Sequence, residues 1–109
     1  MSVLSGARVV VTGGAGNVGS QIVDAALAAG AAEVVAFDAL IRGVSENLAG
    51  ALATGRARLA ELDVRDRAAV GEALAGADYV FHQAALRWTL CQEDPRLCHE
   101  VMVDGTFNV

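Results

Sequence analysis

Glycines at fixed spacing, followed by a single aspartate about twenty residues later, are the residues of this chain best suited to chemistry. The stretch Thr12–Gly19 reads TGGAGNVG and directly follows the apolar run Val9–Val11. Glycine permits a tight turn and a close approach of the backbone to another molecule. A helix that starts in such a turn presents free N–H groups and a positive dipole end, both of which bind phosphate. The stretch therefore predicts a pyrophosphate-binding turn.

The glycines fit two registers. Gly14, Gly16 and Gly19 match G-x-G-x-x-G. Gly13, Gly16 and Gly19, preceded by Thr12, match T-G-x-x-G-x-x-G instead. The spacing T-G-x-x-x-G-x-G fails, because Asn17 stands where it would need a glycine. A motif of this kind is a weak signal by itself, so the surrounding elements must decide whether it binds a dinucleotide.

The elements that would position the turn follow a strand–helix–strand order. The β-branched run Val9–Val11 suits a strand that is buried on both faces. Apolar residues then recur at helical spacing over residues 17–29, and Gly30 is placed to end the helix. Glu33–Phe37 reads as a second strand. A βαβ unit favours a right-handed crossover and parallel pairing, which is the context that the motif requires.

Asp38 follows the second strand, where the dinucleotide fingerprint places an acid for the adenosine ribose. Its carboxylate can accept from both ribose hydroxyls and would repel a 2′-phosphate, so it predicts NAD as the cofactor. NADP is the less favoured cofactor; it stays an option because the guanidinium of Arg42 could pair with its 2′-phosphate. The favoured interpretation places Arg42 along the adenine edge or in solvent.

The remaining pattern predicts two further strands and the helices between them. These are a helix capped by Ser45 and ended by Gly55, a strand over Arg58–Leu62, a helix over Ala68–Leu74 and a strand over Tyr79–His82. The predicted fold class is α/β: a Rossmann-like, doubly wound parallel sheet of about four strands in order 3-2-1-4, with helices on both faces. We expect residues 1–109 to form one domain.

Candidate cofactor contacts also follow the third and fourth strands. Asp63 can take the adenine amino group while Val64 packs on the ring; equally, Asp63 can be a plain strand exit. Gln83, Ala84 and Ala85 follow the fourth strand, and the two small side chains leave room for a cofactor that crosses the switch point of the sheet.

The C-terminal quarter carries less chemistry. Arg87–Thr89 are expected to open a longer loop, which faces a substrate or simply packs. Asp94 and Pro95 read as an N-cap with proline at the first helical position. The helix that follows is predicted to run to the end of the chain, with one face formed by Leu97, Val101 and Phe107.

Histidine and cysteine spacing shows no metal or redox motif. Cys91 and Cys98 form no C-x-x-C pair, and His82 and His99 have no ligand spacing with them. We interpret the cysteines as reduced structural thiols. A single histidine at the end of a strand, as at His82, is more often hydrogen-bonded structure than a catalytic group.

Composition excludes several classes of function. The net charge of −5 argues against general binding to nucleic acid or to an anionic membrane. A hydrophobic content of 54% with one proline indicates a packed globular domain rather than a disordered chain. Neither a signal peptide nor a membrane-spanning segment is recognisable, so we expect a cytoplasmic protein.

Five motifs in their usual order resemble the N-terminal part of the extended short-chain dehydrogenase/reductases, that is, the NAD-dependent epimerase/dehydratase family. They lie at Thr12–Gly19, Asp38–Leu48, Leu62–Asp66, Val80–Leu86 and, after the pair DP, Val103–Val109. The resemblance implies that the pyrophosphate contacts Gly13, Gly16, Asn17 and Val18, and that the ribose contacts Asp38. It also implies that adenine contacts Asp63 and Val64. Gln83, Ala84 and Ala85 are then expected to border the nicotinamide half of the cofactor.

Members of that family transiently oxidise a sugar hydroxyl with NAD, using a Tyr-x-x-x-Lys pair. This chain contains no lysine, and its only tyrosine, Tyr79, has Gln83 four residues later. Met102 stands where the family usually has asparagine, which affects support of the active-site backbone. The resemblance therefore implies the NAD-binding portion of an enzyme acting on a nucleotide sugar, with the chemistry housed in sequence outside this chain.

The alternative is a stand-alone module that senses NAD or pairs with another subunit. Its physical basis is the free edge of the fourth strand, which invites pairing with another chain, including a second copy of this one.

Overall fold

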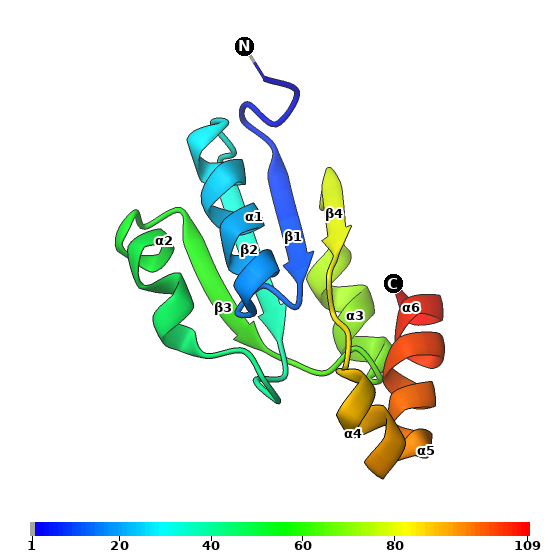
Figure 1. The fold of residues 1–109 in the computed structure, drawn as a ribbon. Helices are drawn as coiled ribbons and strands as arrows, with labels where there is room; N and C mark the ends of the chain where they lie inside the picture. Colours follow the sequence, from blue (N-terminus) through cyan, green and yellow to red (C-terminus); the bar gives the residue numbers. More distant parts are fainter. Residues whose placement is uncertain (1) are drawn as a thin grey trace.

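The computed structural model describes residues 2–109 and contains a parallel sheet of four strands in the order β3-β2-β1-β4. The strands are β1 (Arg8–Thr12), β2 (Glu33–Asp38), β3 (Ala57–Glu61) and β4 (Tyr79–His82). All three pairings are parallel, and β1 lies between β2 and β4 (Figure 1). The predicted fold class and strand order are confirmed.

Helices cover both faces of the sheet (Figure 1). One face packs against α1 (Asn17–Ala28), the 3-10 helix η1 (Ser45–Leu48) and α2 (Ala49–Ala53). The other face packs against α3 (Arg67–Leu74) and the π-helical segment η2 (Glu100–Asp104). The shorter helices α4 (Trp88–Glu93), α5 (Pro95–His99) and α6 (Gly105–Asn108) complete the C-terminal part.

The central strand explains why the core has two halves. Val9 and Val11 point into the half formed with α1, while Val10 points into the half formed with α3, and all three are 0% exposed. Side chains alternate between the faces of a strand, so an unbroken valine run fits a strand that is covered on both sides. This confirms the prediction made for Val9–Val11.

Several predicted boundaries hold and others shift. Gly30 ends α1 in the left-handed conformation, with φ of 94°. Asp66 caps α3 by accepting the Ala69 N–H at 3.1 Å, and Asp94 caps α5. The third strand begins and ends one residue earlier than predicted. Ser45 makes no capping hydrogen bond; it begins η1 instead.

The C-terminal segment corrects two expectations. A helix begins at Trp88, so Arg87–Thr89 do not open a long loop. From Pro95 onward α5, η2 and α6 follow one another without a break, which agrees with the helix predicted there. Phe107, however, is 91% exposed, whereas Val101 is buried. The six residues from Val101 to Phe107 make about one and two-thirds helical turns, so Phe107 stands away from the face that packs on the sheet.

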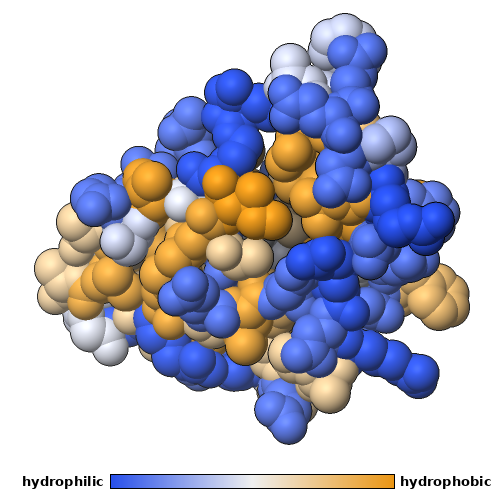
Figure 2. Space-filling model, turned by 90° about the horizontal axis from the view of Figure 1, so that it is seen from below, coloured by the Kyte–Doolittle hydropathy of each residue, from blue (hydrophilic) through white to orange (hydrophobic). Residues whose placement is uncertain are grey.

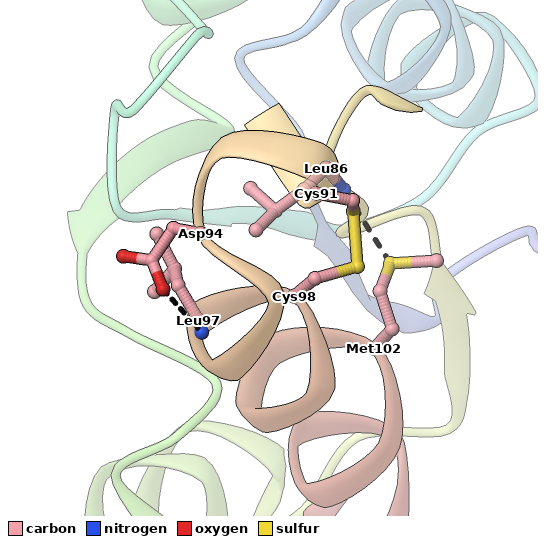
Figure 3. The surroundings of a disulfide bond; sticks show 6 residues. All are labelled: Leu86, Cys91, Asp94, Leu97, Cys98 and Met102. Carbon is pink, nitrogen blue, oxygen red and sulfur yellow. Dashed lines mark hydrogen bonds between the residues drawn. A yellow bond between two sulfur atoms is a disulfide. The ribbon is translucent and has the colours of Figure 1, made fainter. Parts of the chain in front are cut away.

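The prediction of reduced cysteines is wrong. Cys91 in α4 and Cys98 in α5 form a disulfide, with Cα atoms 4.9 Å apart (Figure 3). The two helices meet at Asp94, whose backbone is not helical, and this bend brings the cysteines together. Their separation of seven residues matches no local motif, so spacing alone did not reveal the pair.

No helix within the described residues is both long and apolar enough to cross a membrane.

Candidate functional site

A groove runs along the edge of the sheet where the four parallel strands end. It has two adjoining hollows, one lined by Asp38, Asp63 and Val64 among others and one beside the N-terminus of α1. Both hollows are lined by Gly13, Gly16, Arg42, Gln83 and Ala85, which makes them one continuous site. Figure 2 looks onto this face, where hydrophobic residues gather around the middle and hydrophilic ones form most of the rim.

The structure brings every sequence-predicted site residue to this groove. The residues that line it are Gly13, Gly16, Asn17, Val18, Asp38, Arg42, Asp63, Val64, Gln83, Ala84 and Ala85. They come from the turn after β1 and from the segments after β2, β3 and β4. Residues far apart in sequence therefore meet because the carboxyl ends of parallel strands share one edge.

The glycine-rich turn is closely packed from both sides. Gly13 has a φ of 68°, and a Cβ atom there would lie 2.7 Å from the carbonyl carbon of Gln83. A Cβ at Gly19 would overlap the carbonyl oxygen of Gly13. Gly13 therefore allows both the turn and the approach of the segment after β4, and Gly19 allows α1 to start against the turn.

The N-terminus of α1 has the features of an anion site. Gly16 is its N-cap, and the first intrahelical bond runs from Ser20 N to Gly16 O at 2.9 Å. The N–H groups of Asn17 and Val18 precede that bond, so they have no intrahelical acceptor. No acidic residue stands in the first turn of α1. Free N–H groups and the helix dipole thus favour phosphate at this end of the groove.

Asp38 is tied to the turn by its backbone neighbours. One carboxylate oxygen accepts the Ala15 N–H at 2.9 Å, and the other accepts the Leu40 N–H at 2.7 Å. A carboxylate has about four acceptor positions. Two of these remain for a ligand that lies in the groove, so the acid is both held in place and still able to bind two hydroxyls.

Asn47 is a site residue that sequence reasoning missed. Its side-chain amide donates to Ala15 O at 2.9 Å, and Val44 N donates to the same oxygen at 3.1 Å. Asn47 also lines the groove beside α1. The turn is therefore clamped by Asp38 at the N–H of Ala15 and by η1 at its carbonyl. No local pattern signals a contact across 32 residues.

Asp63 has a partner within the chain. Its carboxylate accepts from the Arg65 guanidinium at 2.7 Å and from the Arg65 backbone N–H at 2.9 Å. The side-chain hydrogen bond from Arg65 lowers the pKa of Asp63. Val64 is only 5% exposed and packs against Gly105, where a Cβ would lie 2.6 Å from a Val64 methyl carbon. Both residues still border the groove.

Between the polar ends the groove is apolar. Its walls there are formed by Phe37, Ile41, Leu62, Leu86 and Val101. Such a slot suits a flat aromatic ring, as ligand sites are mostly apolar with a few placed polar groups. Among the described residues no group of three or more His, Cys, Asp and Glu side chains is arranged to hold a metal ion.

His82 makes structural hydrogen bonds, as the sequence predicted. Its ring nitrogens lie 2.6 Å from Thr12 Oγ1 and 3.0 Å from Thr106 Oγ1. Burial lowers its pKa. Met102, at the position where the resemblance leads one to expect asparagine, accepts the Leu86 N–H through its sulfur at 3.4 Å (Figure 3). The backbone after β4 thus keeps a hydrogen bond at this position, though from a weak acceptor.

A parallel sheet in this order, with a glycine-rich turn and groove at its switch point, defines a Rossmann-like domain of the doubly wound class. The chain belongs to the NAD dependent epimerase/dehydratase family, whose sequence model matches residues 9–109.

Known proteins similar to this chain are larger. The low-salt glycan biosynthesis protein Agl12 of Haloferax volcanii is 44% identical over 78 residues, which cover 71% of this chain and 25% of that protein. The enzyme WbmF of Bordetella bronchiseptica, solved in complex with NAD+, is 30% identical to this chain and superposes with a TM-score of 0.87. The match covers 98% of this chain and 32% of the WbmF chain.

A third similar protein is the UDP-glucose 4-epimerase of Thermus thermophilus, solved with NAD. It is 38% identical to this chain, with a TM-score of 0.78. The match covers 93% of this chain and 32% of the epimerase chain. The chain thus spans about a third of the length of these solved structures or less.

Proposed function

We propose that this chain is the NAD-binding portion of an NAD-dependent epimerase/dehydratase that acts on a nucleotide sugar. The catalytic tyrosine and lysine of such an enzyme lie outside these residues. Similar proteins are an NAD-bound enzyme and a UDP-glucose 4-epimerase, which supports the cofactor and the substrate class.

The observation that carries the proposal is the position of Asp38 relative to the turn. The carboxylate lies at the end of β2 and is joined to Ala15 inside the glycine-rich loop. A dinucleotide with its pyrophosphate at Asn17 and Val18 would then place its adenosine ribose at Asp38. Adenine would enter the apolar slot beside Val64, and the nicotinamide half would run toward Gln83 and Ala85.

The same geometry favours NAD over NADP. Asp38 would face the ribose hydroxyls, and a 2′-phosphate there would meet a negative charge. Arg42 lines both hollows and is the one cation placed to offset that charge within the described groove. NADP binding is therefore expected, but weaker than NAD binding.

Calorimetric titration of the chain with NAD and with NADP tests the proposal. We expect NAD to bind about tenfold more tightly, because repulsion between two like charges at contact distance costs about 1 kcal/mol or more, and about 1.4 kcal/mol corresponds to a tenfold change in affinity. Adding a UDP-sugar to the NAD complex should produce no NADH. Equal affinity for the two cofactors, or no affinity for either, contradicts the proposal.

A second function, self-association, is favoured by the edge of the sheet. Within the described residues β4 pairs with β1 alone, and Tyr79 and Val80 on β4 are 41% and 39% exposed. An unpaired strand edge with apolar side chains can add a strand from a second copy. Sedimentation velocity would show a dimer that Val80→Lys dissociates. A monomer at every protein concentration rules this function out.

A further inference from the structure

His82 directly precedes the groove residue Gln83 and joins three elements of the fold. Its Nδ1 lies 2.6 Å from the hydroxyl of Thr12 at the end of β1, and its Nε2 lies 3.0 Å from the hydroxyl of Thr106 in α6. Thr12 is 1% exposed, and its hydroxyl oxygen accepts the N–H groups of Gln83 at 3.0 Å and Ala84 at 3.2 Å. One buried hydroxyl therefore links His82 to the backbone of two groove residues.

The direction of each hydrogen bond follows from counting protons. Thr106 donates its single hydroxyl hydrogen to Met102 O at 2.6 Å, so it can only accept from His82 Nε2. The ring is therefore the neutral Nε2–H form, and its Nδ1 accepts the hydroxyl hydrogen of Thr12. Both lone pairs of the Thr12 oxygen remain for Gln83 and Ala84. Every group in the network then has its partner.

We propose that His82 is a positioning residue for the dinucleotide groove, and that protonation of its ring loosens the Gln83–Ala84 wall and weakens cofactor binding. The binding part rests on the proposed function. The structural part stands on the network alone. Once protonated, Nδ1 could no longer accept the hydroxyl hydrogen of Thr12. Its own proton would instead point at the Thr12 oxygen, which already accepts two N–H groups. The least costly relief is movement of the segment after β4.

That segment is in direct contact with the phosphate turn. A Cβ at Gly13 would lie 2.7 Å from the backbone carbon and oxygen of Gln83, so the two backbones already touch. A shift of Gln83 therefore changes the space beside Gly13 and Gly16, which line both hollows. This contact carries the effect of the His82 ring to the bound pyrophosphate.

The groups that face His82 are neutral hydroxyls from β1 and α6. The charged residues of β1 and η2 face other partners. Arg8 lies at the opposite end of β1, and the carboxylate of Asp104 lies 3.9 Å from the His99 ring. Glu100, also on η2, contributes to the electrostatics of Arg65. Burial alone accounts for the lowered pKa of His82. The ring itself is therefore the group whose titration controls the network.

The test measures the NAD dissociation constant between about pH 7.5 and about pH 5, a range that spans histidine titration and stays above that of aspartate. For the unmodified chain we expect affinity to fall about tenfold across it. His82→Asn places an amide oxygen near the Nδ1 position, so it should keep the affinity seen at high pH and lose the pH dependence. The control His99→Asn should keep that dependence.

A pH dependence that persists in His82→Asn overturns the proposal. So does an affinity of the unmodified chain that stays constant at pH values where the NMR signals of the His82 ring show it to be protonated. His82→Leu, which removes the acceptor, should bind weakly at every pH. If this variant does not fold, the asparagine variant still decides.

A second readout needs no cofactor and separates this inference from the proposed function. In NMR spectra of the free chain, the amide signals of Gln83 and Ala84 should move along the same titration curve as the His82 ring, and should stop doing so in His82→Asn. Amide signals of Gln83 and Ala84 that do not follow the titration curve of the His82 ring overturn the positioning role. If NAD never binds but the amides follow the ring, the proposed function fails and the positioning role stands.

Discussion

The backbone N–H of Ala15 donates to the carboxylate of Asp38 at 2.9 Å. This bond joins the loop after β1 to the end of β2, so the predicted phosphate turn and the predicted ribose acid form one unit. Leu40, held by the other oxygen of Asp38, has a φ of 61°. A non-glycine residue in this conformation is uncommon, and the hydrogen bond to Asp38 helps to hold it there.

Asp38→Asn should weaken NAD binding about tenfold and reduce the preference over NADP, because a charge-assisted hydrogen bond contributes about 1.5 kcal/mol or more. Calorimetric titration with both cofactors measures this. Glu61→Gln is the matched control: Glu61 is the register partner of Asp38 on β3 and is exposed. If the asparagine variant keeps the NAD affinity of the unmodified chain, Asp38 does not bind the ribose.

Gly19→Ala should destabilise the fold by about 3 kcal/mol, because its Cβ would overlap the backbone oxygen of Gly13 and the packed turn has no room to move. Gly71→Ala, also inside a helix but with open space around it, should instead stabilise by about 0.5 kcal/mol or more. Urea denaturation of the two variants gives both values. Equal effects would mean that the turn is not close-packed.

Asn47→Ala should lower the free energy of unfolding by about 1 kcal/mol, the usual value of one hydrogen bond, because Ala15 O loses its side-chain donor. NAD affinity should fall by about fivefold as the turn loses one clamp. Ser45→Ala, in the same 3-10 helix, is the control, since the Ser45 side chain makes no capping bond. A loss of affinity in the serine variant would point to η1 as a whole instead.

Reduction of the disulfide between Cys91 and Cys98 should destabilise the chain by about 2 kcal/mol, the entropy expected for a short closed loop. The measurement is the thermal midpoint with and without a dithiol reductant. The double variant Cys91→Ser/Cys98→Ser should have the lower midpoint under both conditions. Two reactive thiols in the untreated native chain would show that the bond does not form in solution.

The stability of the chain should also fall in mild acid. Burial lowers the pKa of His82, so the unfolded chain, where histidine titrates near 6.5, binds more protons between the two pKa values. The contribution of His82 is therefore complete above about pH 6.5 and is lost as the pH falls through the folded-state pKa. Urea midpoints of the unmodified chain should drop between about pH 7.5 and about pH 5 more than those of His82→Asn.

The elements and groove residues that the sequence predicted share one property: each rests on a short-range pattern. The valine run, the glycine spacing and the capping residues Asp66 and Asp94 express backbone preferences over a few residues. Their relative positions then follow from one topological rule for parallel strands. That is why residues from four separate segments could be assigned to one edge of the sheet before the structure was known.

What the sequence missed depends on contacts between distant segments. The cysteine pair needs the bend at Asp94, which brings α4 and α5 together. The clamp on Ala15 by Asn47 spans 32 residues, and the bond between Thr12 and His82 spans 70. A side chain's partner at such distances depends on packing, which no local pattern records.

By itself, the sequence determined the strand–turn–helix around the glycines, the acid after β2 and the family of the chain, because local backbone propensity and motif spacing are written in consecutive residues. Only the tertiary structure decided which atoms hold that site in place. The hydroxyl of Thr12 pairs with the ring of His82, and the carboxylate of Asp38 accepts the N–H of Ala15. Folding removes these groups wholly or partly from water, and a polar group removed from water needs a partner within the protein.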